Sequence, residues 1–322
     1  VLQDQGKFND AMQQYQKALE MKLKAYGPDH SSTASTYHRI GDVLQDQGKS
    51  LEAMEHYQKA LGIFLEVHGT EHSSTADIYH SIGNVLCSQG KYKEAMQHYQ
   101  TALKIKLKAY GPSHTNAALT YQKIGEVLQH QGIHEEASDR FQQALAIYRR
   151  EVGENHPRVA MIYNFIAKDL AQRGEHDEAA ERLDKAIEIQ LMNSRENHPD
   201  LATIYITMGD LLLKKNQFKL DDAAEFYDKA LTIRMKVFGE GHSFFGEVLQ
   251  KKSELPLGLE HSSTGSPYHC IGNVLQDQGK FNDAMQQYQK ALEMKLKAYG
   301  PDHSSTASTY HRIGDVLQDQ GK

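Results

Sequence analysis

Small and hydrophobic residues return along this chain at a fixed step of 42 residues, the distance from Gly6 to Gly48 and from Gly48 to Gly90. Each unit carries a tyrosine, an isoleucine three positions later, a glycine next to it and a leucine three further on. An alanine, an aromatic residue and a second alanine follow at spacings of four and three. The first complete unit places this pattern at Tyr37, Ile40, Gly41, Leu44, Ala53, Tyr57 and Ala60. Because such spacings put side chains on one face of a helix, each unit is predicted to form two helices with one apolar stripe each.

The later units keep the pattern with a few substitutions. One unit has Ala167 in place of the glycine and Leu183 in place of the aromatic residue. The unit that starts at Tyr205 has two extra residues in its turn. The pattern therefore predicts a row of similar units rather than separate unrelated domains.

Two kinds of break separate the predicted helices. The sequence Gln-Gly-Lys recurs at residues 5–7, 47–49 and 89–91, and its glycine continues at Gly132 and Gly174. A glycine there can take the left-handed conformation that ends a helix. The sequence Tyr-Gly-Pro-Asp-His-Ser-Ser ends the second helix, and Ser31 or Ser32 is expected to cap the next first helix. Each unit is therefore predicted to be a helical hairpin. We expect Gly41 to face Ala53, so that the two backbones approach closely between Tyr37 and Tyr57.

The combined pattern Y-x2-I-G-x2-L and A-x3-Y-x2-A resembles the signature of tetratricopeptide repeats, whose usual period of about 34 residues is exceeded here. The longer second helix and loop resemble the repeats of kinesin light chains and nephrocystin-type arrays, most clearly over Glu154–Ile189. The resemblance implies an all-α, right-handed superhelical solenoid of antiparallel helix hairpins. It also implies that the first helices line a concave groove that holds a ligand.

The period fails between His242 and His261, which lie closer together than one unit. We expect a repeat array over residues 1–242, a truncated repeat or junction over 243–267, and a resumed array over 268–322. An error in the gene model is an alternative explanation of the break. Within it, Phe245, Gly246 and Leu249 fit the end of a first helix.

Residues 1–49 and 274–322 are identical. Tandem duplication produces such copies, and a solenoid tolerates them because each hairpin contacts only its neighbours. Leu2, Tyr15, Ile313 and Leu317 would each lack one neighbour, and no polar cap covers them. We therefore expect the chain to be a fragment of a longer array.

The composition narrows the function classes. A net charge of −6, from 36 basic and 42 acidic residues, disfavours a protein that neutralises nucleic-acid phosphates. No apolar run approaches the length of about 18 residues that a membrane helix needs. Cys87 and Cys270 lie far apart and form no disulfide framework, which favours a reducing, cytoplasmic compartment. No phosphate loop or nucleophile motif is present, so we expect no catalysis and no cofactor.

The resemblance assigns the groove to four positions of each first helix: three before the glycine, and one, four and five after it. The residues singled out there are His38, Asp42, Gln45, His80, Asn84, Cys87, Gln122, Glu126, Gln129, Asn164, Lys168, Asp210, His269, Asn273, His311 and Asp315. They make a polar surface rich in histidine and glutamine. The predicted partner is a protein, bound as a peptide segment or as a domain.

Three more specific functions can be weighed against these residues. A groove for chaperone carboxylates needs lysine at the position of His38, and no unit has it. Light-chain grooves have asparagine there, which only Asn164 keeps, and no heptad region for a coiled coil is present. We therefore expect a non-catalytic scaffold, with a kinesin-light-chain-like adaptor as one form of it. The alternative is a sensor arm of a signalling NTPase or other enzyme whose catalytic domain lies outside this sequence.

Histidines and a cysteine raise further hypotheses. The loop histidines, such as His30 and His72, are expected to bond to neighbouring backbone rather than to hold a metal. His38 and His80 could titrate near neutral pH and make binding pH-sensitive. Cys87 is expected to be a small groove residue rather than a nucleophile, because no basic partner is evident.

Overall fold

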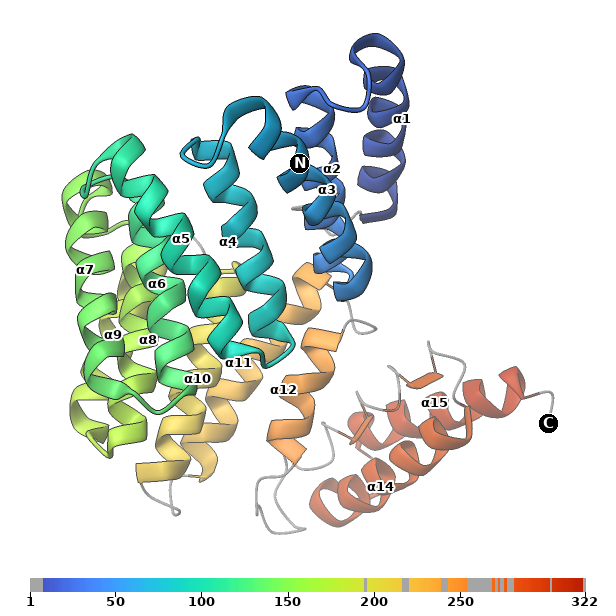
Figure 1. Cartoon of the computed structure of the whole chain (residues 1–322). Coiled ribbons are helices and arrows are strands. Elements are labelled where there is room, and N and C mark those ends of the chain that lie inside the picture. Colours follow the sequence, from blue (N-terminus) through green and yellow to red (C-terminus); the bar gives the residue numbers. More distant parts are fainter. Residues whose placement is uncertain are drawn as a thin grey trace. The chain divides into compact units, whose positions relative to one another are not determined.

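The computed structural model describes residues 8–193, 196–215, 220–238, 243–253, 268–269, 272, 275–276, 281–301 and 303–320. All regular elements in these ranges are α-helices (Figure 1). The chain divides into two compact units, Val1–Phe165 and Ile166–Lys322, with the division inside α8.

The helices follow one another in pairs. The first unit contains α1 (Phe8–Tyr26), α2 (Ser31–Asp46), α3 (Ser50–His68), α4 (Ser73–Ser88), α5 (Tyr92–Tyr110), α6 (Thr115–His130), α7 (His134–Val152) and the start of α8 (Pro157–Arg173). The second contains the rest of α8, then α9 (His176–Met192), α10 (Pro199–Lys215), α11 (Leu220–Phe238), α12 (Ser243–Ser253), α14 (Phe281–Tyr299) and α15 (Ser304–Asp319).

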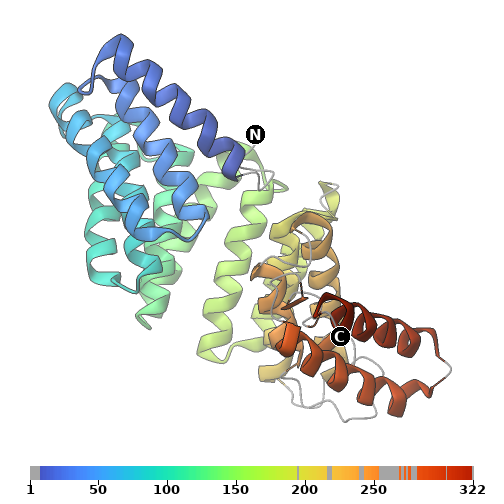
Figure 2. The ribbon, with the colours of Figure 1, turned by 90° about the vertical axis from the view of Figure 1, so that its right-hand side faces the viewer.

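Neighbours in sequence are neighbours in space. In the first unit α2 packs on α3, α4 on α5 and α6 on α7. The second helices α1, α3 and α5 also pack on the first helices that follow them, α2, α4 and α6. In the second unit α10 packs on α11, and α11 on α12. Figure 2, turned by 90°, shows the blue-to-green helices side by side in chain order. The predicted all-helical array of hairpins is confirmed.

The turns inside the hairpins use glycine as predicted. Gly48 has a φ of +76°, in the left-handed region that glycine adopts without a steric penalty. The N–H of Lys49 then donates to the carbonyl of Leu44 at 2.8 Å, which satisfies an acceptor at the end of α2. Gly90 repeats this geometry after α4, with a φ of +74°.

In the loops between hairpins, a histidine caps the start of the next helix. His30 is the N-cap of α2, and its Nδ1 accepts the N–H of Ser32 at 3.1 Å. The prediction that Ser31 or Ser32 caps this helix was therefore wrong, because both already lie in its first turn. The same bond, between 3.1 and 3.2 Å, is made in the later loops by His72, His114, His156 and His198. The expected backbone bonding of loop histidines is confirmed at these positions.

Inside each hairpin, the first-helix glycine lies against an aromatic ring. A Cβ atom at Gly41 would lie 2.5 Å from Cε1 of Tyr57, which is too close for any side chain. The expectation that Gly41 chiefly faces Ala53 needs correction, since the three nearest atoms all belong to Tyr57. The same close approach recurs in four more hairpins, in the pairs Gly83–Tyr99, Gly125–Phe141, Gly209–Tyr227 and Gly272–Tyr288.

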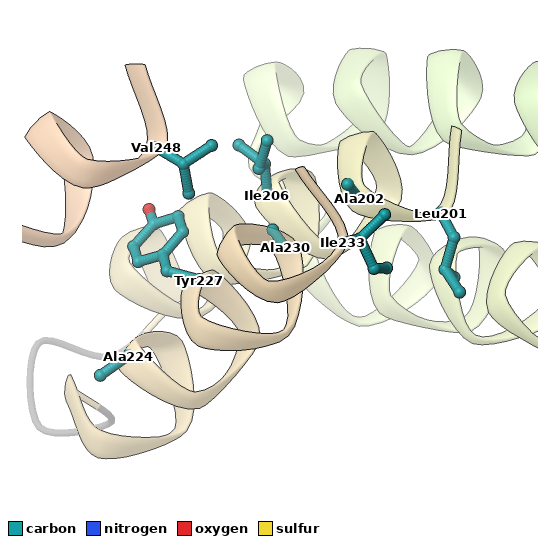
Figure 3. Packing of buried hydrophobic residues seen from close by; sticks show 8 residues of the cluster. All are labelled: Leu201, Ala202, Ile206, Ala224, Tyr227, Ala230, Ile233 and Val248. Carbon is teal, nitrogen blue, oxygen red and sulfur yellow. The ribbon is translucent and has the colours of Figure 1, made fainter. Parts of the chain in front are cut away.

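One hydrophobic cluster joins α10, α11 and α12 (Figure 3). Tyr227 is 1% exposed, and Ile206 and Val248 approach it from the two first helices. The cluster comprises Leu201, Ala202, Ile206, Ala224, Tyr227, Ala230, Ile233 and Val248. The second unit therefore buries its apolar stripes between successive helices, as the repeat pattern predicts.

The helix within the predicted break begins in a different register from the one expected. The first helices with regular caps start one residue after the loop histidine, as Ser31 follows His30. Helix α12 likewise starts at Ser243, after His242, so Gly246 corresponds to Ala34. No atom of the described residues lies within 4 Å of a Cβ at Gly246, unlike at Gly41.

Helix α12 is therefore the beginning of a first helix, and the assignment of Gly246 to the helix-end pattern was wrong. That pattern alone could not fix the register, because the rest of the repeat is missing. Residues 254–267, where the predicted junction continues, lie outside the described residues.

Candidate partner-binding groove

A cavity of about 340 Å³ lies over the first helices α2, α4 and α6 of the first unit. It brings together three of the predicted groove residues, namely His38 and Asp42 from α2 and His80 from α4. The full lining is Ser35, His38, Arg39, Asp42, Phe64, Ser74, Asp77, His80, Ser81, Lys106, Asn116 and Leu119. Predicted binding positions of two successive repeats therefore line the same cavity.

Two lining residues come from second helices and were missed by the sequence analysis. Phe64 of α3 and Lys106 of α5 are 4% and 2% exposed, and each reaches the cavity from behind the first helices. They are 42 residues apart, so they hold the same place in two successive units. We call this place the floor position. It is occupied in other repeats by Lys22, Tyr148, Gln190, Arg234 and Lys295. A long side chain at a constant second-helix register is the signal that could have revealed it.

The buried lysine of the cavity has a carboxylate partner. The ammonium of Lys106 lies 3.2 Å from Oδ1 of Asp77, whose side chain is 50% exposed. Lys22, at the same register, instead donates to the hydroxyl of Thr36 at 2.9 Å and to the carbonyl of Ser32 at 3.1 Å. Desolvating an ammonium is costly, so each of these lysines needs such acceptors.

In three repeats the residue after the first-helix glycine is bonded by the hydroxyl of the tyrosine that packs on that glycine. The Tyr57 hydroxyl donates to Asp42 at 2.9 Å, and the Tyr99 hydroxyl donates to Asn84 at 2.7 Å. In the second unit the Tyr227 hydroxyl donates to Asp210 at 2.6 Å. Three predicted groove residues are therefore fixed in orientation by core tyrosines. Gln45 also accepts a bond from Tyr57, at 3.0 Å.

The carboxylates of the predicted groove form ion pairs with arginine or lysine side chains. Asp42 lies 3.1 Å from Arg39, and Asp210 lies 2.9 Å from Lys251. Where Phe141 replaces tyrosine there is no hydroxyl to bind Glu126. That carboxylate is held at 2.9 Å by both Gln122 and Lys123 instead. The polar surface therefore carries its charge as local pairs.

Three of the predicted groove histidines, His38, His80 and His269, are largely shielded from water. Burial, together with the nearby charges of Lys106 and Lys123, lowers the pKa of His80 to about 3. Burial also lowers the pKa of His38, whose Nε2 shares a 2.9 Å hydrogen bond with Ser81. Burial lowers the pKa of His269 to about 4. The hypothesis that His38 and His80 titrate near neutral pH is wrong, because desolvation disfavours the charged imidazole.

The other predicted residues of the first unit are less accessible than expected. Cys87 is half-buried, and burial raises the pKa of its thiol, which agrees with a non-nucleophilic role. Gln129 is 9% exposed and its amide donates to the carbonyl of Phe165 at 3.5 Å. Asn164 is fully buried, and neither polar atom of its amide has a hydrogen-bond partner among the described residues.

The predicted residues of the second unit are dispersed along it. Lys168 on α8 is half-buried, and His269 lies 3.0 Å from the hydroxyl of Thr309. His311 and Asp315 face solvent on α15, with 3.8 Å between His311 Nε2 and Asp315 Oδ1. Asn273 lies outside the described residues.

None of the helices described is long and apolar enough to cross a membrane. No group of three or more histidine, cysteine, aspartate or glutamate side chains in the described ranges is arranged to hold a metal ion.

Comparisons with solved structures agree with this fold. A Rap protein complexed with competence and sporulation factor has a TM-score of 0.61 at 14% identity, covering 98% of this chain and 87% of that one. BtubC from P. vanneervenii has a TM-score of 0.55 at 18% identity, covering 74% and 92%. A putative kinesin light chain of P. anserina with nearly identical TPR-like repeats has a TM-score of 0.52 at 20% identity, covering 64% and 97%.

At sequence identities this low, the structural similarity shows a common fold and nothing more specific. No curated protein sequence matches the chain significantly. The family profile of the tetratricopeptide repeat is more specific. It matches residues 1–66, 32–108, 74–150, 116–192, 158–236 and 263–322. Together with hairpins that pack in chain order, this coverage shows that the chain belongs to the tetratricopeptide repeat family, whose fold serves as a scaffold for protein interactions.

Proposed function

We propose that this chain is a non-catalytic scaffold that binds an extended peptide segment of a partner protein along its first helices. The observation that carries the proposal is the cavity over α2, α4 and α6, where predicted groove residues from two units converge. The alternative within this proposal is that the partner binds as a folded domain.

The chemistry of the cavity suits a peptide backbone. Its lining mixes the hydroxyls of Ser35, Ser74 and Ser81 with the amide of Asn116, so donors and acceptors alternate over a short distance. The lowered pKa values keep His38 and His80 neutral, and a neutral imidazole offers one donor and one acceptor. A peptide backbone needs both kinds of partner at every residue.

The lining is also prepared for binding. Asp42 is held by Tyr57 and Arg39, and His38 is held by Ser81. Side chains that are already ordered lose little entropy when a ligand arrives, which favours affinity. The structure of a Rap protein complexed with competence and sporulation factor supports the use of this fold for ligand binding. A kinesin-light-chain-like adaptor is one form of the proposed scaffold, supported by the fold shared with a putative light chain.

The test is to capture partners with the full chain and then measure one captured partner against variants. Ser35→Arg and Leu119→Arg place long charged side chains in the cavity from α2 and α6. Each should weaken binding about tenfold or more, because contacts at the centre of an interface contribute most of the binding free energy. The measurement is isothermal titration calorimetry.

Gln58→Arg is the matched control, because Gln58 is exposed on α3 and does not line the cavity. It should bind the partner as the natural chain does. Unchanged affinity in both cavity variants, with full helix content by circular dichroism, would show that the partner binds elsewhere.

A further inference from the structure

The floor position changes the chemistry of the cavity while the packing around it stays the same. Phe64 belongs to α3, which packs on α2 and α4, and Lys106 belongs to α5, which packs on α4 and α6. The pattern residues of both second helices are identical and buried, namely Ala53, Tyr57 and Ala60 in α3 and Ala95, Tyr99 and Ala102 in α5. One cavity therefore has an apolar floor residue in one repeat and a charged one in the next.

The floor at Phe64 is apolar. In the preceding repeat the corresponding residue is Lys22, which shares a hydrogen bond of 2.9 Å with Thr36. Phe64 and the fully buried Ile78 take the places of these two residues, so an apolar pair replaces a hydrogen-bonded one. A ligand side chain over Phe64 gains free energy by leaving water if it is apolar. A polar side chain would instead lose its hydrogen bonds to water.

The floor at Lys106 offers both a donor and an acceptor. The ammonium has three N–H groups, and among the described residues Asp77 is its one ion-pair or hydrogen-bond partner, at 3.2 Å. The Asp77 side chain is 50% exposed, so its carboxylate has accepting positions that the lysine leaves unused. A side-chain amide suits this pair, because its oxygen accepts a hydrogen bond and its NH2 group donates one.

Charged ligand side chains suit this place less well. Two positive and two negative side chains act on His38, namely Arg39, Lys106, Asp42 and Asp77. A ligand carboxylate would compete with Asp77 for the ammonium and would lie near two carboxylates. A ligand cation would compete for Asp77 and would lie near an ammonium that is too buried to move into water. Either charge would have to break an ion pair that involves a buried group, which is strongly unfavourable.

We propose that the floor position selects the ligand side chain, so that the cavity takes a peptide with an apolar side chain over Phe64 and an asparagine or glutamine side chain over Lys106 and Asp77. This inference rests on the proposed function, because it needs a peptide in the cavity. It goes further by naming two side chains that the peptide carries. Second-helix residues thus decide specificity, although first helices supply most of the lining.

The first test uses the natural chain. A phage-displayed library of random peptides is selected on the full chain, and one enriched peptide is synthesised and measured by isothermal titration calorimetry. Enriched peptides should share an apolar residue and an asparagine or glutamine at a constant separation. Alanine in place of the amide residue should weaken binding about tenfold, because hydrogen bonds to charged groups are lost. Aspartate or lysine there should weaken it at least as much, because the ion pair is disturbed.

The second test makes the floor at Phe64 polar. Phe64→Lys combined with Ile78→Thr copies the pair of Lys22 and Thr36, which the fold already accepts. This double variant should bind the enriched peptide about tenfold or more weakly, because the apolar side chain loses its buried contact. Alanine in place of the apolar peptide residue should then make little further difference, since both changes remove the same contact.

The third test makes the floor at Lys106 apolar. Lys106→Phe, Thr120→Ile and Asp77→Ser together give it the residues found at Phe64, Ile78 and Ser35. The natural chain should prefer the enriched peptide over a version with leucine in place of the amide residue. The triple variant should reverse this preference, with a change in the affinity ratio of about tenfold or more.

Lys22→Phe combined with Thr36→Ile is the matched control. It makes the opposite exchange at a floor position that does not line the cavity, so it should bind the enriched peptide as the natural chain does. Urea unfolding followed by circular dichroism shows whether each variant is folded. The peptide substitutions are measured on the natural chain, so they test the amide preference whether or not a variant folds.

The outcomes separate this inference from the proposed function. If no peptide is enriched, both are overturned. If Ser35→Arg abolishes binding of the peptide while folded floor variants bind it unchanged, only the role of the floor position is overturned. Enriched peptides that share an acidic or a basic residue in place of the amide also overturn it. A preference that follows the floor residues in both exchanges supports it.

Discussion

At the scale of single residues, the floor position is matched to one position of the next first helix. Lys22 donates to Thr36, and Lys295 donates to Thr309, both at 2.9 Å. Where the floor residue is Phe64, the matching residue is the fully buried Ile78. A polar side chain is thus paired with a hydroxyl and an apolar one with an aliphatic group, as buried packing requires.

In one repeat the floor residue has no polar partner among the described residues. Gln190 is fully buried, and both polar atoms of its amide have no hydrogen-bond partner among the described residues. Its matching residue is Ile204, which has no polar atom to offer. An unsatisfied buried amide costs about 1–3 kcal/mol.

We therefore expect Gln190→Leu to stabilise the chain by about 1–3 kcal/mol, since it removes the unsatisfied amide at nearly constant volume. The measurement is the midpoint of urea unfolding followed by circular dichroism. Lys106→Leu is the contrasting variant, because it leaves Asp77 without its ion-pair partner. A lower midpoint for Gln190→Leu than for the natural chain would contradict the expectation.

The buried imidazole of His80 predicts a loss of stability in acid. Its pKa of about 3 in the folded chain lies below the value near 6.5 of an exposed histidine. The native state therefore favours the neutral form. The contribution is complete above about pH 6.5 and is lost as the pH falls towards 3. Its size is up to roughly 5 kcal/mol.

His80→Gln should reduce this dependence, because glutamine is neutral throughout that range. The expected result is a smaller decrease of the unfolding midpoint between about pH 6.5 and pH 4 in the variant than in the natural chain. Equal pH profiles would mean that other groups dominate the acid sensitivity.

At the scale of elements, the start of each first helix depends on a histidine cap. His114 accepts the N–H of Asn116 at 3.1 Å and stacks on Tyr110, with ring centroids 4.6 Å apart. The stack holds the imidazole in place, and Nδ1 then satisfies a donor that the helix itself leaves unpaired. Capping is a task for which serine, threonine, aspartate and asparagine are the usual residues.

We expect His114→Ala to cost about 0.5–2 kcal/mol, the usual effect of losing an N-cap acceptor. His114→Asn should restore most of that loss, because its amide oxygen can accept the same bond. Thermal unfolding of both variants checks this. A rescue that fails while alanine destabilises would assign the loss to the ring stack rather than to the cap.

The hairpins and their breaks could be predicted from the sequence because they depend on local spacing and on glycine. The packing between helices could not. Gly41 was expected to face Ala53, but the large ring of Tyr57 covers it because a long side chain reaches further than the register suggests. Lys106 was not included in the groove, since helical periodicity cannot show that a second-helix side chain passes between two first helices. The register of α12 was missed because a shortened unit keeps too few pattern residues.

At the scale of the whole chain, the described helices pack on their neighbours in sequence within each unit. Stability in such an array is approximately a sum over repeats and their neighbouring interfaces. Changes at His114 and Gln190, which belong to different units of the chain, should therefore be additive. The candidate groove residues could be predicted as positions on the first helices, but not their burial, which depends on the floor residues of each repeat.

The pairing of each glycine with a ring in its own hairpin has an evolutionary consequence. Both partners are encoded within a short stretch, so a crossover in the loops that join hairpins inherits them together. Whole hairpins can then be gained or lost in evolution without separating a glycine from the ring that packs on it. The number of hairpins in this protein can therefore change in evolution while the packing inside each hairpin stays the same.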